Sequence, residues 1–169
     1  MGGENYLIPV RAKLRKPADL DVQAVPVDLV LKQMDFAQSA VNIVILDACR
    51  NNPLSSAGRG ASRGLAEIKL KPVGSFISFS TAPGAVAEDG NGANSPYTAA
   101  LADAIQRPGM DLAEVFRTVR KSVLKATNQK QTPWDSWSLT DPYYFVPPTA
   151  GIARSHRARW PRQSMHPRR

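Results

Sequence analysis

A single cysteine, Cys49, stands at the end of an apolar run in this chain of 169 residues. The run covers 41–46 (VNIVIL) and is typical of a buried strand. The polar segment 47–53 (DACRNNP) follows it and cannot continue such a strand. A loop at the rim of a sheet is where open α/β folds hold reacting groups. A free cysteine is more often inert packing. The polar neighbours of Cys49 instead favour an exposed thiol that could act as a nucleophile.

The segments around Cys49 predict how that loop is positioned. Asp28 is a plausible N-cap, and apolar residues recur at helical spacing up to position 37. This predicted helix leads directly into the 41–46 strand, which indicates half of a βαβ unit and parallel pairing. Residues 74–82 (GSFISFSTA) read as the next strand, because they are rich in aromatic and β-branched residues.

The rest of the chain supplies the other predicted elements. Residues 5–10 read as a short strand with Pro9 at an edge, and residues 11–27 read as a loop. Ser95 is expected to cap one helix and Asp111 the next, and 143–146 reads as a last strand. Strands alternating with helices predict the α/β class, with helices covering a mostly parallel sheet on both faces.

The charge of the chain is concentrated in its last segment. The net charge is +8, but residues 150–169 hold six arginines and no acidic residue. Without them the chain carries 16 basic and 14 acidic residues, a net charge of +2. We therefore expect a domain over residues 1–149 and a disordered basic tail over 150–169.

The composition also limits the compartment and the ligands. No apolar run is long enough to cross a membrane, and no secretory signal is seen, so we expect no membrane association and favour the cytoplasm. A single cysteine cannot form an internal disulfide. No metal-ligand cluster, phosphate loop or dinucleotide fingerprint is found, so we expect no metal and no cofactor.

Several blocks of this sequence together resemble one peptidase family. The segment 41–53 is similar to the nucleophile strand and loop of the caspase-like peptidases of clan CD, in particular their bacterial and metacaspase-type members. Five further blocks occur in the family's order: NYLIPV at 5–10, FSTAPG with AEDG at 79–90, NSPYT at 94–98, VFRTVR at 115–120 and QTPW at 131–134. The resemblance extends over about residues 3–146. It implies a three-layer caspase-like fold that lacks its N-terminal strands.

The resemblance implies cysteine endopeptidase activity on a protein or peptide substrate. Cys49 would attack the peptide carbonyl and form an acyl-enzyme. Asp47 would line the pocket for the residue before the cut, which implies cleavage after Arg or Lys. A strand-end cap is the equally weighted alternative for Asp47. Glu88 and Asp89 would flank this pocket, or would simply be solvated loop acids. The strand that carries Ser78 and Ser80 would offer backbone groups to an extended substrate.

The catalytic histidine of the family has no counterpart in the predicted fold. The family carries a histidine followed by glycine on a strand upstream of the 5–10 segment. The two histidines here, His156 and His166, lie in the basic tail, and neither precedes a glycine. Without an imidazole, a thiol with a pKa of about 8.5 is only a few per cent ionised at neutral pH. Loss of the glycine's oxyanion donor adds about 2.7–4 kcal/mol to the barrier. We expect negligible activity from this chain alone.

Three explanations account for the absent segment: a gene fragment, a decayed copy, or a separate chain that supplies the N-terminal half.

The competing interpretation of function is a non-catalytic binding module. The arginines of the tail and Trp160 could contact nucleic acid, although an incidental extension is the preferred interpretation. No calcium-binding loop is recognised, although some metacaspase relatives need calcium.

Overall fold

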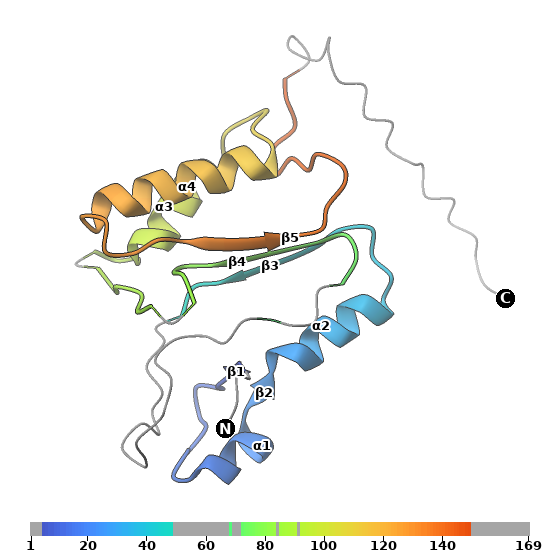
Figure 1. Ribbon diagram of the computed structural model, residues 1–169, viewed down its shortest axis with the longest axis vertical. Coiled ribbons are helices and arrows are strands. Elements are labelled where there is room, and N and C mark those ends of the chain that lie inside the picture. The colour runs from blue at the N-terminus through green and yellow to red at the C-terminus, as the bar shows by residue number, and fades with distance from the viewer. Residues whose placement is uncertain (1–4, 49–67, 69–71, 84, 91, 150–169) are drawn as a thin grey trace, which may run out of the picture.

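The computed structural model describes residues 5–48, 68, 72–83, 85–90 and 92–149 of the chain. Their central feature is a sheet with the strand order β3-β4-β5 (Figure 1). Strand β3 (Asn42–Leu46) pairs in parallel with β4 (Ser75–Phe79), in the register Asn42↔Ser75 to Leu46↔Phe79. Strand β5 (Trp134–Trp137) pairs antiparallel with β4. The predicted parallel step is confirmed, but the described sheet is mixed rather than mostly parallel.

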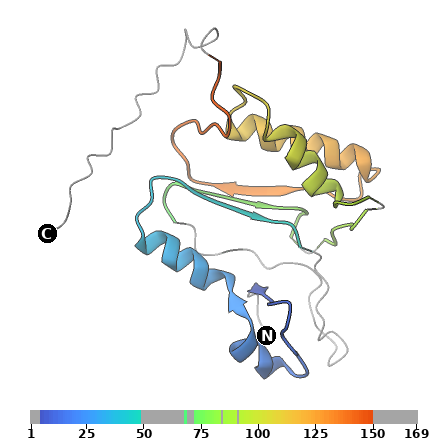
Figure 2. The same ribbon diagram turned by 180° about the vertical axis from the view of Figure 1, so that it is seen from behind.

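Helices cover both faces of this sheet, as expected from the sequence (Figures 1 and 2). Helix α2 (Val27–Phe36) lies on one face, and α3 (Pro96–Ala104) and α4 (Leu112–Ala126) lie on the other. Alternate residues of β4 point to opposite faces. Ile77 and Phe79 therefore pack with the α2 side, and Phe76 packs with α3 and α4.

The larger core cluster lies between the sheet and the α3–α4 pair. One face of α4 is buried there, and it consists of Leu112, Val115, Phe116, Val119 and Val123. The ring centroids of Phe76 and Phe116 are 4.4 Å apart, which joins the sheet directly to α4. Tyr97 and Ala104 of α3 are fully buried in the same cluster. This packing fixes α3 and α4 against β4.

The N-terminal part differs from the expected loop over residues 11–27. Strand β1 (Tyr6–Leu7) pairs antiparallel with β2 (Val25–Pro26), and the chain between them forms the 3-10 helix η1 (Pro17–Asp19) and the short helix α1 (Leu20–Gln23). Asp19 accepts hydrogen bonds from two backbone amides just before η1. These short elements depend on specific polar contacts and show no hydrophobic periodicity, so the sequence pattern missed them.

Two predicted boundaries are corrected by the structure. Helix α2 begins at Val27 after the N-cap Pro26, so Asp28 lies in the first turn and is not the cap. The last strand is Trp134–Trp137 and not 143–146. Segment 143–146 makes one isolated bridge, from Tyr144 to Asp111, and packs the rings of Tyr143 and Phe145 on the core. Trp134 and Trp137 are about half exposed because β5 lies at the sheet edge, and this exposure hid the strand pattern.

The capping predictions for the two later helices are confirmed. The side chain of Ser95 accepts a hydrogen bond from the backbone amide of Thr98, and Asp111 accepts one from the amide of Glu114. Pro96 occupies the first helical position of α3, where a missing amide hydrogen is tolerated. Helix α3 therefore begins at a defined residue beside the end of β3.

The packing predicts a contrast between two phenylalanines. Phe116→Ala should lower the free energy of unfolding by about 3–5 kcal/mol, because it opens a cavity beside Phe76. Phe36→Ala is the matched control: Phe36 is 86% exposed on α2, and its loss should change that free energy by less than about 0.5 kcal/mol. Urea denaturation of both variants measures the difference. Equal losses would contradict the proposed core.

Candidate active site at the carboxyl end of strand β3

The end of β3 exposes Asp47, one of the residues that the sequence singled out. The strand stops at Leu46, and both Asp47 and Ala48 are exposed. Cys49 lies outside the described residues, and so do residues 50–67. The candidate site is therefore built from the neighbours of Cys49, above all from Asp47.

Asp47 is held by the first turn of helix α3. Its Oδ2 atom accepts a hydrogen bond from the hydroxyl of Ser95 and another from the hydroxyl of Thr98. Ser95 is also the N-cap, and its Oγ accepts the Thr98 amide at 2.9 Å. A negative charge is favoured at a helix N-terminus, where backbone amides point outward. The carboxylate is therefore fixed in position while it stays open to solvent.

The anchoring of Asp47 brings together residues that are far apart in the sequence. Asp47 and Ser95 are 48 positions apart, and Asp47 and Thr98 are 51 apart. The sequence identified Ser95 as a cap and Asp47 as a candidate pocket residue. Neither local pattern indicated that the Ser95 hydroxyl both caps α3 and binds Asp47.

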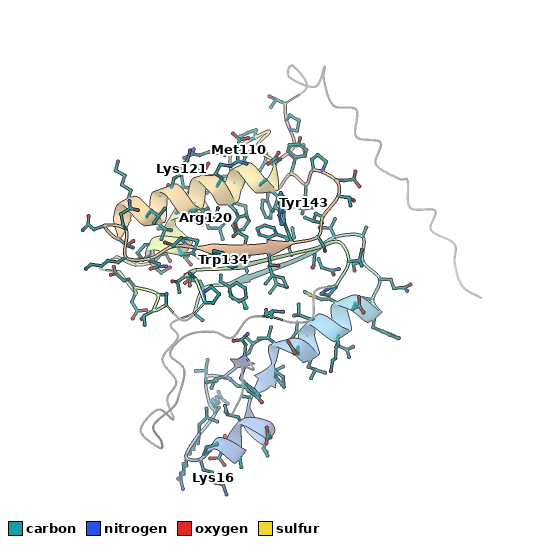
Figure 3. The ribbon with its side chains drawn as sticks, viewed as in Figure 1. Lys16, Met110, Arg120, Lys121, Trp134 and Tyr143 are labelled. Atoms are coloured by element: carbon teal, nitrogen blue, oxygen red, sulfur yellow. The ribbon has the colours of Figure 1, made fainter. Side chains whose placement is uncertain are left out.

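Ser78 lies inside the protein and belongs to a polar network. It is fully buried on β4, and its hydroxyl donates to Asp135 Oδ1 at 2.9 Å. A hydroxyl has one hydrogen, so Tyr97 must donate its own to Ser78 Oγ, 2.7 Å away. Asp135 in turn pairs with Arg120 of α4, whose Nε also donates to the Pro133 carbonyl at 2.9 Å. Figure 3 shows Arg120 on the side of α4 that faces β5.

Ser80 is also committed to internal contacts. It is 1% exposed, its amide donates to the Leu46 carbonyl at 3.0 Å, and its carbonyl accepts from Gln131 Nε2 at 2.8 Å. Strand β4 has a neighbour on each side, so the backbone around Ser78 is engaged in the sheet. Both serines therefore make internal contacts in this structure, and their role in binding a substrate stays a prediction.

Gln131 fixes the loop that carries the two candidate acids. Its side chain is fully buried, and its Oε1 accepts the backbone amide of Glu88 at 2.9 Å while its Nε2 holds Ser80. Positive φ angles at Asn128 and Gln129 turn the chain after α4, and the amide of Gln131 donates to Thr127 Oγ1. Glu88 is half-buried, and Asp89 is exposed on the same loop. The sequence placed Gln131 in a family block but gave it no role.

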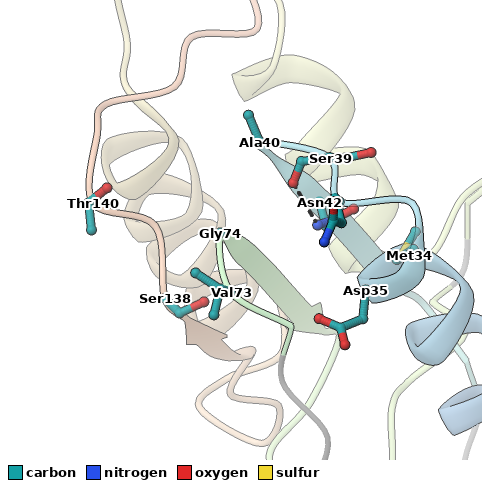
Figure 4. Close-up of a pocket in the computed structure, with 10 residues that line it drawn as sticks. Met34, Asp35, Ser39, Ala40, Asn42, Val73, Gly74, Ser138 and Thr140 are labelled. Atoms are coloured by element: carbon teal, nitrogen blue, oxygen red, sulfur yellow. Dashed lines mark hydrogen bonds between the residues drawn. The ribbon is translucent and has the colours of Figure 1, made fainter.

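A cavity among the described residues lies at the other end of the sheet. It has a volume of about 440 Å³ and surrounds the amino ends of β3 and β4, where Asn42 and Gly74 stand (Figure 4). Asp35, Ser39 and Thr140 also line it. Ligands of parallel sheets bind at the carboxyl ends of the strands, so this cavity is separate from the Asp47 site.

The described residues include no group of acidic, histidine or cysteine side chains that could hold a metal ion. They also include no helix long and apolar enough to span a membrane. The basic tail, including both histidines, lies outside the described residues, and so does Trp160.

Comparison with known proteins identifies the family. Residues 1–144 match the family model of the caspase domain, peptidase family C14, so the chain belongs to this family of caspase-like cysteine peptidases. Among solved structures it is similar to caspase-1 from Spodoptera frugiperda, with 19% identity and a TM-score of 0.43. The match covers 63% of this chain and 46% of that one, so the chain spans about half the length of that caspase. No curated protein matches the chain.

The buried network predicts a specific dependence of stability on pH. Burial of the phenol raises the pKa of Tyr97 far above its ordinary value of 10.0. Above about pH 10 the unfolded chain loses a phenol proton that the folded chain keeps, so the free energy of unfolding should fall as pH rises. The slope from this group approaches about 1.4 kcal/mol per pH unit. Urea unfolding between pH 8 and 11 should show a shallower decline for Tyr97→Phe. An unchanged slope would contradict the assignment.

The Gln131 contacts predict local opening of the acidic loop. Gln131→Leu leaves the Ser80 carbonyl and the Glu88 amide without their partner, which should lower the free energy of unfolding by about 1–3 kcal/mol. The Glu88 amide should also exchange its hydrogen faster than in the wild type, as measured by NMR. Gln106→Leu removes an exposed glutamine that bonds only a nearby backbone carbonyl, and it is the control. Equal exchange rates at Glu88 in both variants would contradict this role.

Proposed function

We propose that this chain carries the nucleophile and part of the substrate pocket of a caspase-like cysteine endopeptidase. Membership of the caspase-domain family supports the class of reaction and a protein or peptide substrate. The observation that carries the finer proposal is the carboxylate of Asp47, which is exposed, fixed by two hydroxyls and located two residues before Cys49. A fixed negative charge at that place suits a basic side chain just before the cut.

The proposed chemistry assigns each candidate residue a role. The thiolate of Cys49 attacks the carbonyl carbon of the peptide bond, and the amine leaves after it has gained a proton. The acyl-enzyme is then hydrolysed by water, which releases the new carboxylate and restores the thiol. Asp47 holds the Lys or Arg side chain that precedes the cut. Glu88 and Asp89 add negative potential near the substrate from the loop that Gln131 fixes.

The general base in this proposal comes from a segment other than the described residues. Both histidines of the chain lie in 150–169, beyond the residues that match the family. This segment would supply an imidazole and an oxyanion donor to Cys49. Among the described residues β3 pairs with β4 alone, so the opposite edge of β3 is where a further strand would add.

Affinity labelling tests the nucleophile and the pocket without the need for a general base. A lysyl chloromethyl ketone should alkylate Cys49 about fivefold faster than its neutral norleucyl analogue, which corresponds to about 1 kcal/mol for a solvent-accessible ion pair. Mass spectrometry of the intact protein measures both rates. Asp47→Asn should abolish the difference between the probes, and Cys49→Ala should abolish labelling.

The outcome that would refute this proposal is equal labelling by the two probes in the wild-type chain. Asp141→Asn is the matched control, because Asp141 is an exposed aspartate whose carboxylate also accepts a threonine hydroxyl. It should keep the wild-type preference for the lysyl probe.

A further inference from the structure

The hydroxyl groups on Asp47 restrict how it can bind a cation. Both hydroxyls donate to the same oxygen, Oδ2, one from Ser95 and one from Thr98. An ionised carboxylate has about two acceptor sites on each oxygen. The two sites of Oδ2 are therefore filled from within the protein. The described residues place no hydrogen bond on Oδ1, so this oxygen remains for a ligand.

With only Oδ1 available, Asp47 can bind an arginine side chain less completely than a lysine side chain. A guanidinium makes its strongest contact as a fork, with one hydrogen bond to each carboxylate oxygen. That fork needs a site on Oδ2, which Ser95 and Thr98 occupy. An ammonium is a compact charge with three donors and can bind one oxygen fully. The arrangement therefore removes the usual advantage of arginine over lysine.

We propose that Ser95 and Thr98 are specificity-determining residues that limit Asp47 to recognition through Oδ1. This inference rests on the proposed role of Asp47 in binding the side chain before the cut. It adds that the pocket accepts lysine at least as well as arginine, although a free aspartate would favour arginine. Thr98 is the residue through which this can be tested, because its side chain only donates to Asp47, whereas Ser95 also caps α3.

The test compares two ligands on the full chain. N-acetyl-lysine methylamide and N-acetyl-arginine methylamide are titrated separately, and binding is followed by NMR at the backbone amide of Thr98. The wild type should bind both with dissociation constants within about threefold of each other, because each ligand makes contact through one oxygen. Thr98→Val removes the hydroxyl at nearly constant volume and frees a site on Oδ2. It should raise the preference for arginine about tenfold, which equals about 1.4 kcal/mol.

Two control variants separate specificity from a structural effect. Thr98→Ser keeps a hydroxyl and should retain the wild-type ratio of the two affinities. Thr140→Val removes a threonine hydroxyl that donates to Asp141 at 3.3 Å, on the rim of the cavity at the opposite end of the sheet. It should leave the ratio unchanged. A general loss of stability would weaken both ligands alike and would not move the ratio.

The outcomes also separate this inference from the proposed function. If both ligands bind in an Asp47-dependent way but the ratio is the same in Thr98→Val as in the wild type, the specificity role is wrong and the pocket stands. A wild-type preference for arginine of tenfold or more would overturn the specificity role as well. If neither ligand binds, or if binding is unaffected by Asp47→Asn, the proposed pocket itself is wrong.

Discussion

The central strand β4 is the constraint on which the rest of this structure depends. All five of its residues are buried, and it has a neighbouring strand on each side. A buried hydroxyl without a partner costs about 1–3 kcal/mol, so Ser78 requires hydrogen bonds. Tyr97 and Asp135 provide them, and Arg120 balances the charge of Asp135. One buried serine thereby ties α3, β5 and α4 to the middle of the sheet.

Buried polar groups also require hydrogen-bond partners at the carboxyl end of β4, beside the candidate site. The carbonyl of Ser80 needs a donor, and Gln131 supplies it while it also holds the amide of Glu88. On the neighbouring strand the chain leaves the sheet at Asp47 and meets the first turn of α3. The turn after α4 and the start of α3 are therefore both fixed to one end of the sheet. The loops that carry the candidate residues are positioned by polar contacts from rigid elements.

The sequence predicted those parts of the fold whose signals are local. Apolar runs and helical periodicity indicated β3, β4 and α2. The caps Ser95 and Asp111 marked the starts of α3 and α4, because a cap and its amide lie within three residues. Strand β5 was missed because its two tryptophans are half exposed at an edge. The family was identified from ordered blocks, and the match over residues 1–144 confirms it. The anchors of Asp47 and the contacts of Gln131 could not be predicted, because they join residues more than 40 positions apart.

The anchoring of Asp47 carries a physical trade-off. A carboxylate on a loop end has several side-chain conformations, and a ligand that binds it must restrict them at a cost in entropy. Hydrogen bonds from Ser95 and Thr98 restrict Asp47 before any ligand arrives, and the N-terminus of α3 favours its charge. Each of these hydrogen bonds also fills an acceptor site that a ligand could have used. A pocket built on Asp47 therefore gains a fixed charge and loses part of its capacity for hydrogen bonds. The gain is largest for a ligand that carries a compact charge and needs only one oxygen.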